Sequence, residues 1–332
     1  MYPTTRLRRL RNQPWLRDIV AENVITTDDL IWPCFITEGT NLLKAIPTLL
    51  DVYRYSIDQL LIKLEEAVEL GIKAIAIFPS IDPKLKDEMG TEALNPDNLL
   101  SRAVKAIKNK YPELGIICDV ALDPYTTHGH DGVLNDQELV DNDRTIEILT
   151  KQALNLVQAG CSMVAPSDMM DGRIGAIRHA LDQQGFYDIP ILAYAAKYAS
   201  GLYASFRDAV GSSSTLQKKD KKHYQMNPAN AREALREIEL DIREGADIIM
   251  IKPGTLYLDI IARAFDNFNT PIFAYHVSSE YAMLKFAAAN NALNYNKTLI
   301  ETMICFKRAG CSGIISYAAI DVAKILKLGE TL

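Results

Sequence analysis

The sequence predicts an α/β protein folded as a single (β/α)8 TIM barrel with an extended N-terminal arm, and three observations support this prediction. Eight short apolar segments recur along the 332-residue chain, with helical patterns between them. The segments are apolar throughout instead of alternating, which is typical of parallel strands covered on both faces. Polar, reactive residues follow these segments, and the active sites of barrel enzymes lie at the carboxyl ends of their strands.

The individual elements follow from these patterns. Strands are expected at residues 30–36, 74–78, 116–122, 163–165, 191–194, 248–251, 272–275 and 313–316. The expected helices include residues 57–70, 99–110, 146–159, 229–244, 280–290 and 297–309. A glycine precedes four of the strands, where a left-handed residue commonly ends a helix: Gly71, Gly160, Gly245 and Gly310. The main alternative, an open doubly wound sheet, requires a glycine-rich phosphate loop after the first strand, and the sequence has none.

Composition restricts the class of protein. The net charge of −6 argues against nucleic acid as a main partner. No apolar run approaches the roughly 18 residues of a membrane span, and residues 1–18 lack the apolar centre of a signal peptide. Five scattered cysteines without C-x-x-C spacing predict neither a disulfide framework nor a thiolate zinc knuckle. These features fit a protein of the reducing cytoplasm.

Two segments are expected to lie outside the barrel core. Residues 1–23 carry five arginines together with Leu7, Leu10, Trp15 and Leu16, so they form either a disordered tail or an arm that docks on a neighbouring subunit. Residues 24–332 then form the catalytic barrel. The polar stretch at residues 211–223 is either a solvated loop or part of a mobile lid, about residues 201–226, over the barrel mouth.

Two lysines at strand ends are the most informative residues. Lys197 closes the apolar run 191–196, and Lys252 closes the run 247–251. Lysine is seldom buried unless it is paired, and burial favours its neutral amine, a nucleophile that forms Schiff bases with ketones. A single lysine of this kind could simply extend its ammonium group into water. Two at equivalent positions favour a catalytic role.

Several longer motifs resemble those of the 5-aminolevulinate dehydratase, or porphobilinogen synthase, family. They are Ala-Ala-Lys-Tyr-Ala-Ser at 195–200, Phe-Arg-Asp-Ala at 206–209, Tyr-Gln-Met-Asn-Pro at 224–228 and Met-Ile-Lys-Pro-Gly at 250–254. Further matches lie at residues 127–130, 165–172 and 275–278, and the resemblance extends from about residue 5 to the C-terminus.

The resemblance implies an enzyme of tetrapyrrole (heme) biosynthesis that condenses two molecules of 5-aminolevulinate into porphobilinogen and releases two waters. It implies that Lys252 forms a Schiff base with the propionate-side substrate and Lys197 with the acetate-side substrate. Asp119 would be an acid near the substrate amine. No organic cofactor is implied.

The resemblance also implies two grips on the substrate carboxylates. Arg207, Lys221 and Gln225 match the residues that hold one carboxylate, and Ser278 and Tyr317 match those that hold the other. The family commonly has arginine where this chain has Lys221, so the positive charge is kept and the bidentate fork is lost.

The resemblance implies an unusual metal dependence. Zinc-dependent members carry three cysteines after the third barrel strand, where this chain has Ala121, Asp123 and Asp131. Zinc favours thiolate and imidazole ligands, so no catalytic zinc is expected; the neighbouring residues His128 and His130 are expected to be hydrogen-bonding loop residues.

Glu237 matches a carboxylate that binds an activating, allosteric magnesium ion at a subunit interface. The arm resembles the segment that wraps a neighbouring subunit in the homo-octamer of this family.

Two other interpretations remain. A class I aldolase is also a Schiff-base barrel, but it needs one lysine and usually a phosphate grip. A non-catalytic barrel used for assembly, or a nucleic-acid binder acting through the arginine-rich arm, would form no Schiff base at all.

Overall fold

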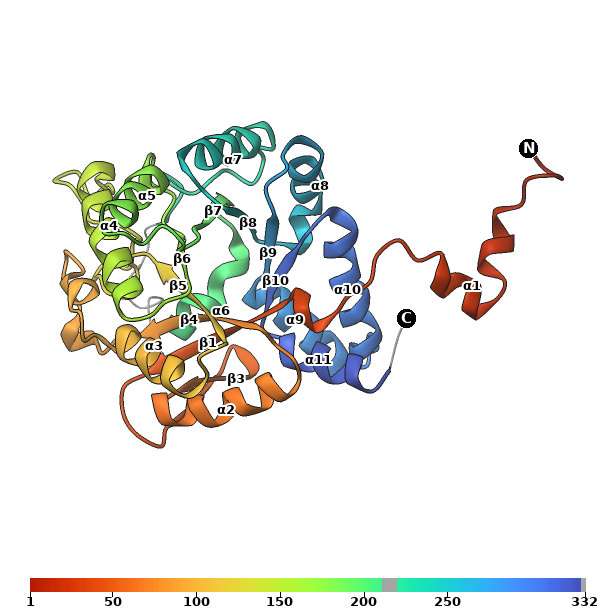
Figure 1. The fold of residues 1–332 in the computed structure, drawn as a ribbon, viewed down its shortest axis with the longest axis horizontal. Helices are drawn as coiled ribbons and strands as arrows, with labels where there is room; N and C mark the ends of the chain where they lie inside the picture. Colours follow the sequence, from red (N-terminus) through yellow and green to blue (C-terminus); the bar gives the residue numbers. More distant parts are fainter. Residues whose placement is uncertain (211–219, 330–332) are drawn as a thin grey trace.

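The computed structural model describes residues 1–210 and 220–329, apart from the side chains of residues 207 and 208, and it confirms the (β/α)8 barrel with its N-terminal arm (Figure 1). The barrel strands are β1 (Leu30–Thr37), β4 (Ala74–Ser80), β5 (Gly115–Val120), β6 (Met163–Pro166), β7 (Leu192–Lys197), β8 (Ile248–Lys252), β9 (Ile272–His276) and β10 (Gly313–Ser316). They pair in parallel in the order β6-β5-β4-β1-β10-β9-β8-β7. A bridge between Val164 and Ile191 joins β6 to the start of β7 and closes the ring.

Helices surround this ring. They are α2 (Ile57–Glu69), α3 (Leu99–Lys110), α4 (Asn142–Gln158), α5 (Arg173–Gln183), α7 (Arg232–Glu244), α8 (Leu258–Asn267), α10 (Tyr295–Ala309) and α11 (Ala319–Lys327). Each turns an apolar stripe inward; in α2 this stripe is Leu60, Leu64 and Ala67, at helical spacing. None of the helices in the described part of the chain has the length and apolar character needed to cross a membrane.

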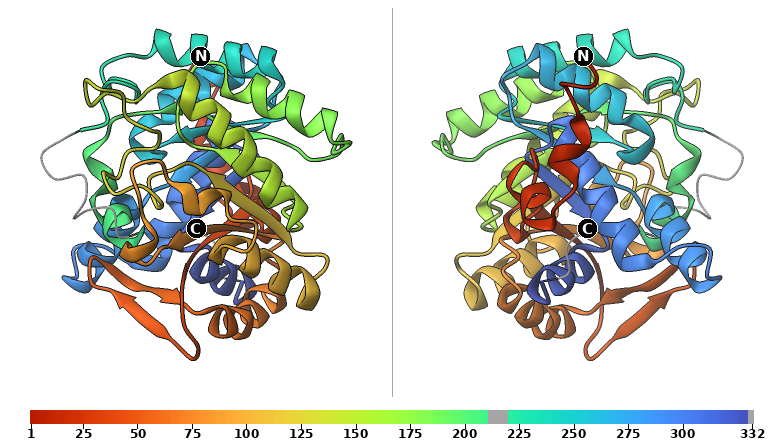
Figure 2. Two further views of the ribbon diagram at one scale, coloured as in Figure 1. Left: turned by 90° about the vertical axis from the view of Figure 1, so that its left-hand side faces the viewer. Right: turned by 90° about the vertical axis from the view of Figure 1, so that its right-hand side faces the viewer.

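Three elements lie at the carboxyl end of the barrel. Helix α6 (Ala204–Val210) packs on α9 (Ser278–Ala289) and on β4. The third is a hairpin of β2 (Leu43–Ile46) and β3 (Leu49–Tyr55), which projects at one edge (Figure 2). This hairpin is not evident from the sequence, because its turn contains none of the Asn-Gly or Asp-Gly pairs that mark a tight connection.

The strands end slightly differently from the expected bounds, and the differences matter for the site. Strand β7 continues three residues past its expected end and includes Lys197 itself. Strand β5 ends at Val120, so Ala121 and Asp123 belong to the following loop. Apolar runs predict the buried part of a strand well, but they do not mark where backbone pairing stops.

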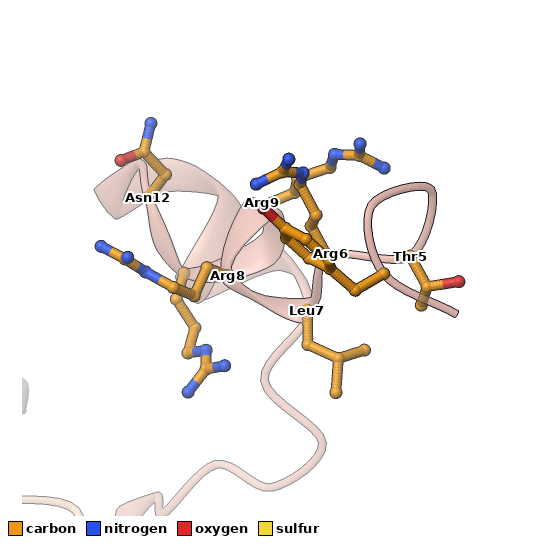
Figure 3. Close-up of a pocket in the computed structure, with 8 residues that line it drawn as sticks. Thr5, Arg6, Leu7, Arg8, Arg9 and Asn12 are labelled. Atoms are coloured by element: carbon orange, nitrogen blue, oxygen red, sulfur yellow. The ribbon is translucent and has the colours of Figure 1, made fainter.

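The arm extends away from the barrel (Figure 1). Its two short helices, η1 (Leu7–Arg11) and α1 (Pro14–Ile19), contain no buried residue, and Trp15 is 60% exposed. A hollow of about 950 Å³ in the arm is lined by arm residues alone, with arginine side chains spread around it (Figure 3). The arm therefore carries apolar side chains that its own barrel does not cover.

Gly310 provides a test of the packing at the end of α10. Its φ is +110°, and a Cβ atom there would meet the side chain of Phe265 at 2.4 Å. We expect Gly310→Ala to lower the free energy of unfolding by about 2–4 kcal/mol, because left-handed strain adds to overpacking. Gly185→Ala is the control, since Gly185 has φ +79° but no neighbour within 4 Å of such a Cβ. Urea denaturation of both variants should give the larger loss at Gly310; equal losses would contradict this account.

Candidate active site

The two lysines lie directly opposite each other at the carboxyl end of the barrel. Lys197 on β7 and Lys252 on β8 are partners in the parallel register, and their exposed fractions are 5% and 4%. They line one cavity whose side chains leave only about 20 Å³ free, roughly the space of one water. The other residues lining it are Asp119, Asp123, Asp131, Ser167, Tyr203, Phe206, Lys221 and Gln225.

Lys252 lies in an aromatic environment. Its Nζ atom is 4.6 Å from the ring centre of Tyr275, 4.7 Å from that of Phe206 and 5.2 Å from that of Tyr194. Within the described residues, no hydrogen bond or ion pair to this Nζ atom is found. Burial, followed by repulsion from Lys197, lowers the pKa of Lys252 to about 7. A substantial fraction of this amine is therefore neutral at neutral pH.

Lys197 has the opposite environment, because its ammonium group is paired. It lies 3.2 Å from Asp131 Oδ1 and donates a hydrogen bond to the carbonyl oxygen of Ser167. The other oxygen of Asp131 is 2.9 Å from Lys221 Nζ. Burial raises the pKa of Asp131, but the two ammonium groups outweigh it and hold that pKa well below its usual range. One carboxylate thus neutralises two cations.

Asp119 lies on β5, within the same cavity. Burial, followed by repulsion from Asp123, raises the pKa of Asp119 to about 7, although Ser167 and the two lysines oppose the shift. Its Oδ1 atom is buried and has no hydrogen-bond partner in the described part of the chain. A carboxyl group that titrates near neutral pH is suited to give and take protons during a reaction.

Two of the residues expected to bind one substrate carboxylate, Lys221 and Gln225, line the cavity. Gln225 is buried, and its Oε1 atom has no partner among the described residues. Lys221 Nζ is held by Asp131 and lies 3.4 Å from Asp123 Oδ2. Arg207 is part of α6, but its side chain falls outside the described residues, as do residues 211–219 of the expected lid.

Ser278 and Tyr317 lie beside the aromatic group instead of lining the cavity. Ser278 begins α9, and its Oγ atom accepts a hydrogen bond from the backbone N–H of Phe206. The hydroxyl groups of Tyr317 and Tyr275 are 3.1 Å apart, which connects Tyr317 to the surroundings of Lys252. Both residues are therefore near Lys252.

The loop after β5 does not fit a three-ligand metal ion. Its three cysteine-equivalent positions provide no sulfur, and Asp123 and Asp131 already bind the ammonium group of Lys221. Among the described residues, no group of three or more His, Cys, Asp or Glu side chains is arranged to hold a metal. His128 accepts a hydrogen bond from the backbone N–H of His130, as expected of a loop residue.

Glu237 lies elsewhere, on the outer helix α7 (Figure 1). Burial raises the pKa of this half-buried carboxyl group, and Asp241 adds to the shift. No ion pair or hydrogen bond to its side chain is found within residues 1–210 and 220–329. A single free carboxylate fits magnesium, which keeps several waters and needs few protein ligands.

Five aromatic site residues were not identified from the sequence. Tyr194, Tyr203 and Tyr275 surround Lys252 together with Phe206, and Tyr224 binds Asp131. An aromatic residue in or beside an apolar run is compatible with an ordinary core position, so only the folded structure shows that four of these rings meet at one amine.

Comparison with known proteins agrees with this geometry. A family model described as Delta-aminolevulinic acid dehydratase matches residues 4–325. The Delta-aminolevulinic acid dehydratase of Bradyrhizobium diazoefficiens is 53% identical, over 97% of this chain and 91% of that protein. That of Rhodobacter capsulatus is 48% identical, over 98% of this chain and 97% of that protein.

A solved structure is similar as well. The Toxoplasma gondii delta-aminolevulinic acid dehydratase (porphobilinogen synthase), in complex with the reaction product porphobilinogen, superposes with a TM-score of 0.95. It is 45% identical, and the match covers 96% of this chain and 91% of that one. The chain therefore belongs to the delta-aminolevulinic acid dehydratase family.

Proposed function

We propose that this protein is the lyase that condenses two molecules of 5-aminolevulinate into porphobilinogen, with loss of two waters, in tetrapyrrole (heme) biosynthesis. Membership of the dehydratase family supports this function. The observation that carries it is the direct pairing of Lys197 with Lys252 in one cavity, because two adjacent amines can each hold one ketone. A class I aldolase would need only one.

The first covalent step belongs to Lys252. Its neutral Nζ attacks the ketone carbon of one 5-aminolevulinate, and a C–N bond forms. The former carbonyl oxygen is protonated and leaves as water, which yields a protonated imine. Asp119, whose pKa is about 7, lines the same cavity and can donate and accept the protons of this step.

The second substrate reacts in the same way at Lys197, after that amine has released its proton, and the second water is lost there. A protonated imine attracts electrons, so a neighbouring C–H bond can release its proton and give an enamine that attacks the other bound substrate. The lysine on the attacked carbon leaves as a free amine, with loss of a second C–H proton. The substrate amine then attacks the remaining imine carbon and closes the ring, the second lysine leaves as a free amine, and loss of a ring proton gives the aromatic pyrrole. The ketone oxygens of the two substrates leave as the two waters.

Orientation of two substrates requires two grips, since holding both reactants in place removes the entropic part of the barrier. Arg207, Lys221 and Gln225 hold one carboxylate, and Ser278 and Tyr317 hold the other. The cavity must widen from its present 20 Å³ to admit substrate. Residues 201–226 act as the lid. Its end at Met226 stays hydrogen-bonded to β7, while Lys221 exchanges Asp123 and Asp131 for the substrate carboxylate.

Metal and assembly complete the proposal. Glu237 would hold a magnesium ion that acts allosterically through subunit contacts, and neither a catalytic zinc nor an organic cofactor would be needed. The arm, residues 1–23, wraps a neighbouring subunit, and this contact covers the exposed side chains of Leu7 and Trp15. The resulting assembly is a homo-octamer, and it acts in the cytoplasm. The barrel, residues 24–332, is the catalytic domain.

Borohydride trapping tests the covalent step. Reduction in the presence of 5-aminolevulinate should attach substrate to Lys252, and peptide mapping should locate the adduct. Lys252→Met should remove that adduct and lower the rate by about four decades or more, because no other group can form this imine. Lys297→Met, at an exposed position of α10, is the matched control and should leave the rate unchanged. Activity of Lys252→Met within tenfold of the native protein would refute the assignment.

The pH dependence of Lys252 gives a second test. Amines react only when unprotonated, so labelling of Lys252 should fall about tenfold per pH unit below its pKa of about 7 and level off above it. Reductive methylation of the substrate-free protein, read for each lysine by mass spectrometry, measures this. Exposed Lys297 serves as the internal reference. A Lys252 profile parallel to the reference would contradict the lowered pKa.

Metal removal gives the third test. After exhaustive chelation we expect basal activity that magnesium raises and that zinc is not needed to restore. Glu237→Ala should abolish the stimulation by magnesium and leave basal turnover unchanged. Glu239→Ala, on the exposed side of the same helix, should keep the stimulation. Full dependence on zinc, with indifference to magnesium, would show that the carboxylates of the β5 loop bind metal after all.

A further inference from the structure

We infer that Tyr224 is a positioning residue, which holds Asp131 as the shared counter-ion of Lys197 and Lys221 and so supports the Schiff base at Lys197. This inference rests on the proposed function. Tyr224 contributes no atom to the cavity lining and is not one of the groups expected to touch substrate. Its effect would reach the reaction only through Asp131.

The groups around the Tyr224 hydroxyl determine which of its hydrogen bonds it donates and which it accepts. Its hydroxyl oxygen lies 2.7 Å from Asp131 Oδ2 and 3.2 Å from the backbone nitrogen of Asp131. The backbone N–H can only donate, and an ionised carboxylate can only accept. The single phenol proton therefore goes to Asp131, and both the side chain and the backbone of that residue are bound by one hydroxyl group.

The tautomer of His130 follows from the same hydrogen bonds. Its Nδ1 atom is 3.3 Å from the Tyr224 hydroxyl oxygen, whose proton is already given to Asp131. The imidazole must then donate from Nδ1, which leaves Nε2 as the unprotonated nitrogen. Tyr224 thus makes one donated and two accepted hydrogen bonds, which is its full capacity, and this fixes the phenol in place.

The backbone carries Tyr224 to this position on the end of β7. The N–H of Met226 donates to the carbonyl oxygen of Lys197 at 3.0 Å, and the N–H of Ala199 donates to the carbonyl oxygen of Met226 at 2.8 Å. The N–H of Gln225 donates to the carbonyl oxygen of Lys221 at 2.9 Å. Tyr224, the backbone of Lys221 and the strand that bears Lys197 are therefore parts of one short hydrogen-bonded unit.

This arrangement matters once substrate is bound. Lys197 becomes a protonated imine, and Lys221 leaves Asp131 for the substrate carboxylate. Asp131 then loses both ammonium partners of the substrate-free site, whereas its bonds to Tyr224 involve no group that substrate needs. A carboxylate kept in place by the phenol can still neutralise the iminium at Lys197. Lys252 is surrounded by aromatic rings and makes no ion pair within residues 1–210 and 220–329, so its adduct should not depend on Tyr224.

The test compares trapped adducts at the two lysines. Each protein is saturated with 5-aminolevulinate and treated with borohydride, which adds hydride to the imine carbon and leaves a stable secondary amine. In Tyr224→Phe the adduct at Lys197 should fall about 10- to 100-fold relative to that at Lys252, the range for losing one hydrogen bond to a charged group. The Lys252 adduct should stay within about twofold of native.

The control is Tyr111→Phe, which removes a phenol that donates to the carbonyl oxygen of Leu61 at 2.9 Å on the outside of the barrel. Both adducts should be unchanged in it. Asp131→Asn supplies a second variant should Tyr224→Phe fold poorly, because it keeps the side-chain shape and removes the charge; it too should lose the Lys197 adduct selectively.

The outcomes are distinct. An unchanged adduct ratio in either folded variant would overturn the inference, and so would an equal fall of both adducts, which is the mark of a merely structural role. Absence of any adduct from the native protein would instead refute the proposed function itself.

Discussion

Two lysines placed side by side on neighbouring strands are the constraint on which the site depends. Lys197 and Lys252 are partners in the parallel register of β7 and β8, and both side chains are buried. Ammonium groups on paired residues of neighbouring strands repel each other, and the low polarity of the interior strengthens the repulsion. The structure relieves it asymmetrically: aromatic rings surround Lys252 and favour its neutral form, whereas Asp131 and the Ser167 carbonyl bind the charged form of Lys197.

The same asymmetry explains the aspartates that follow β5. Where related proteins have thiolates, Asp123 and Asp131 face the ammonium group of Lys221, so charge is balanced by side chains of the chain itself. Asp131 must keep its position between the two ammonium groups, because a buried carboxylate that moved away from them would be unpaired, which is costly. The hydroxyl group of Tyr224 provides that fixation from a segment hydrogen-bonded to β7.

The sequence predicted the barrel because apolar runs and intervening helices have distinct periods, and it predicted both lysines because a charge at the end of a buried strand is anomalous. It did not reveal the β2–β3 hairpin, whose turn has no strong local signal, or the rings around Lys252, which come from four elements. The ion pairs of Lys221 were missed for the same reason. They depend on which distant segments meet, and periodicity within one segment carries no information about that.

The order in which the two lysines react tests the central claim most directly. In a single turnover, 5-aminolevulinate labelled with a heavy isotope is mixed with the protein, quenched with borohydride after milliseconds to seconds, and the adducts are mapped. Because Lys252 is partly neutral and Lys197 is ion-paired, the first adduct should appear at Lys252, with the Lys197 adduct following. Labelling of Lys197 before Lys252 would contradict the electrostatic asymmetry on which this account rests.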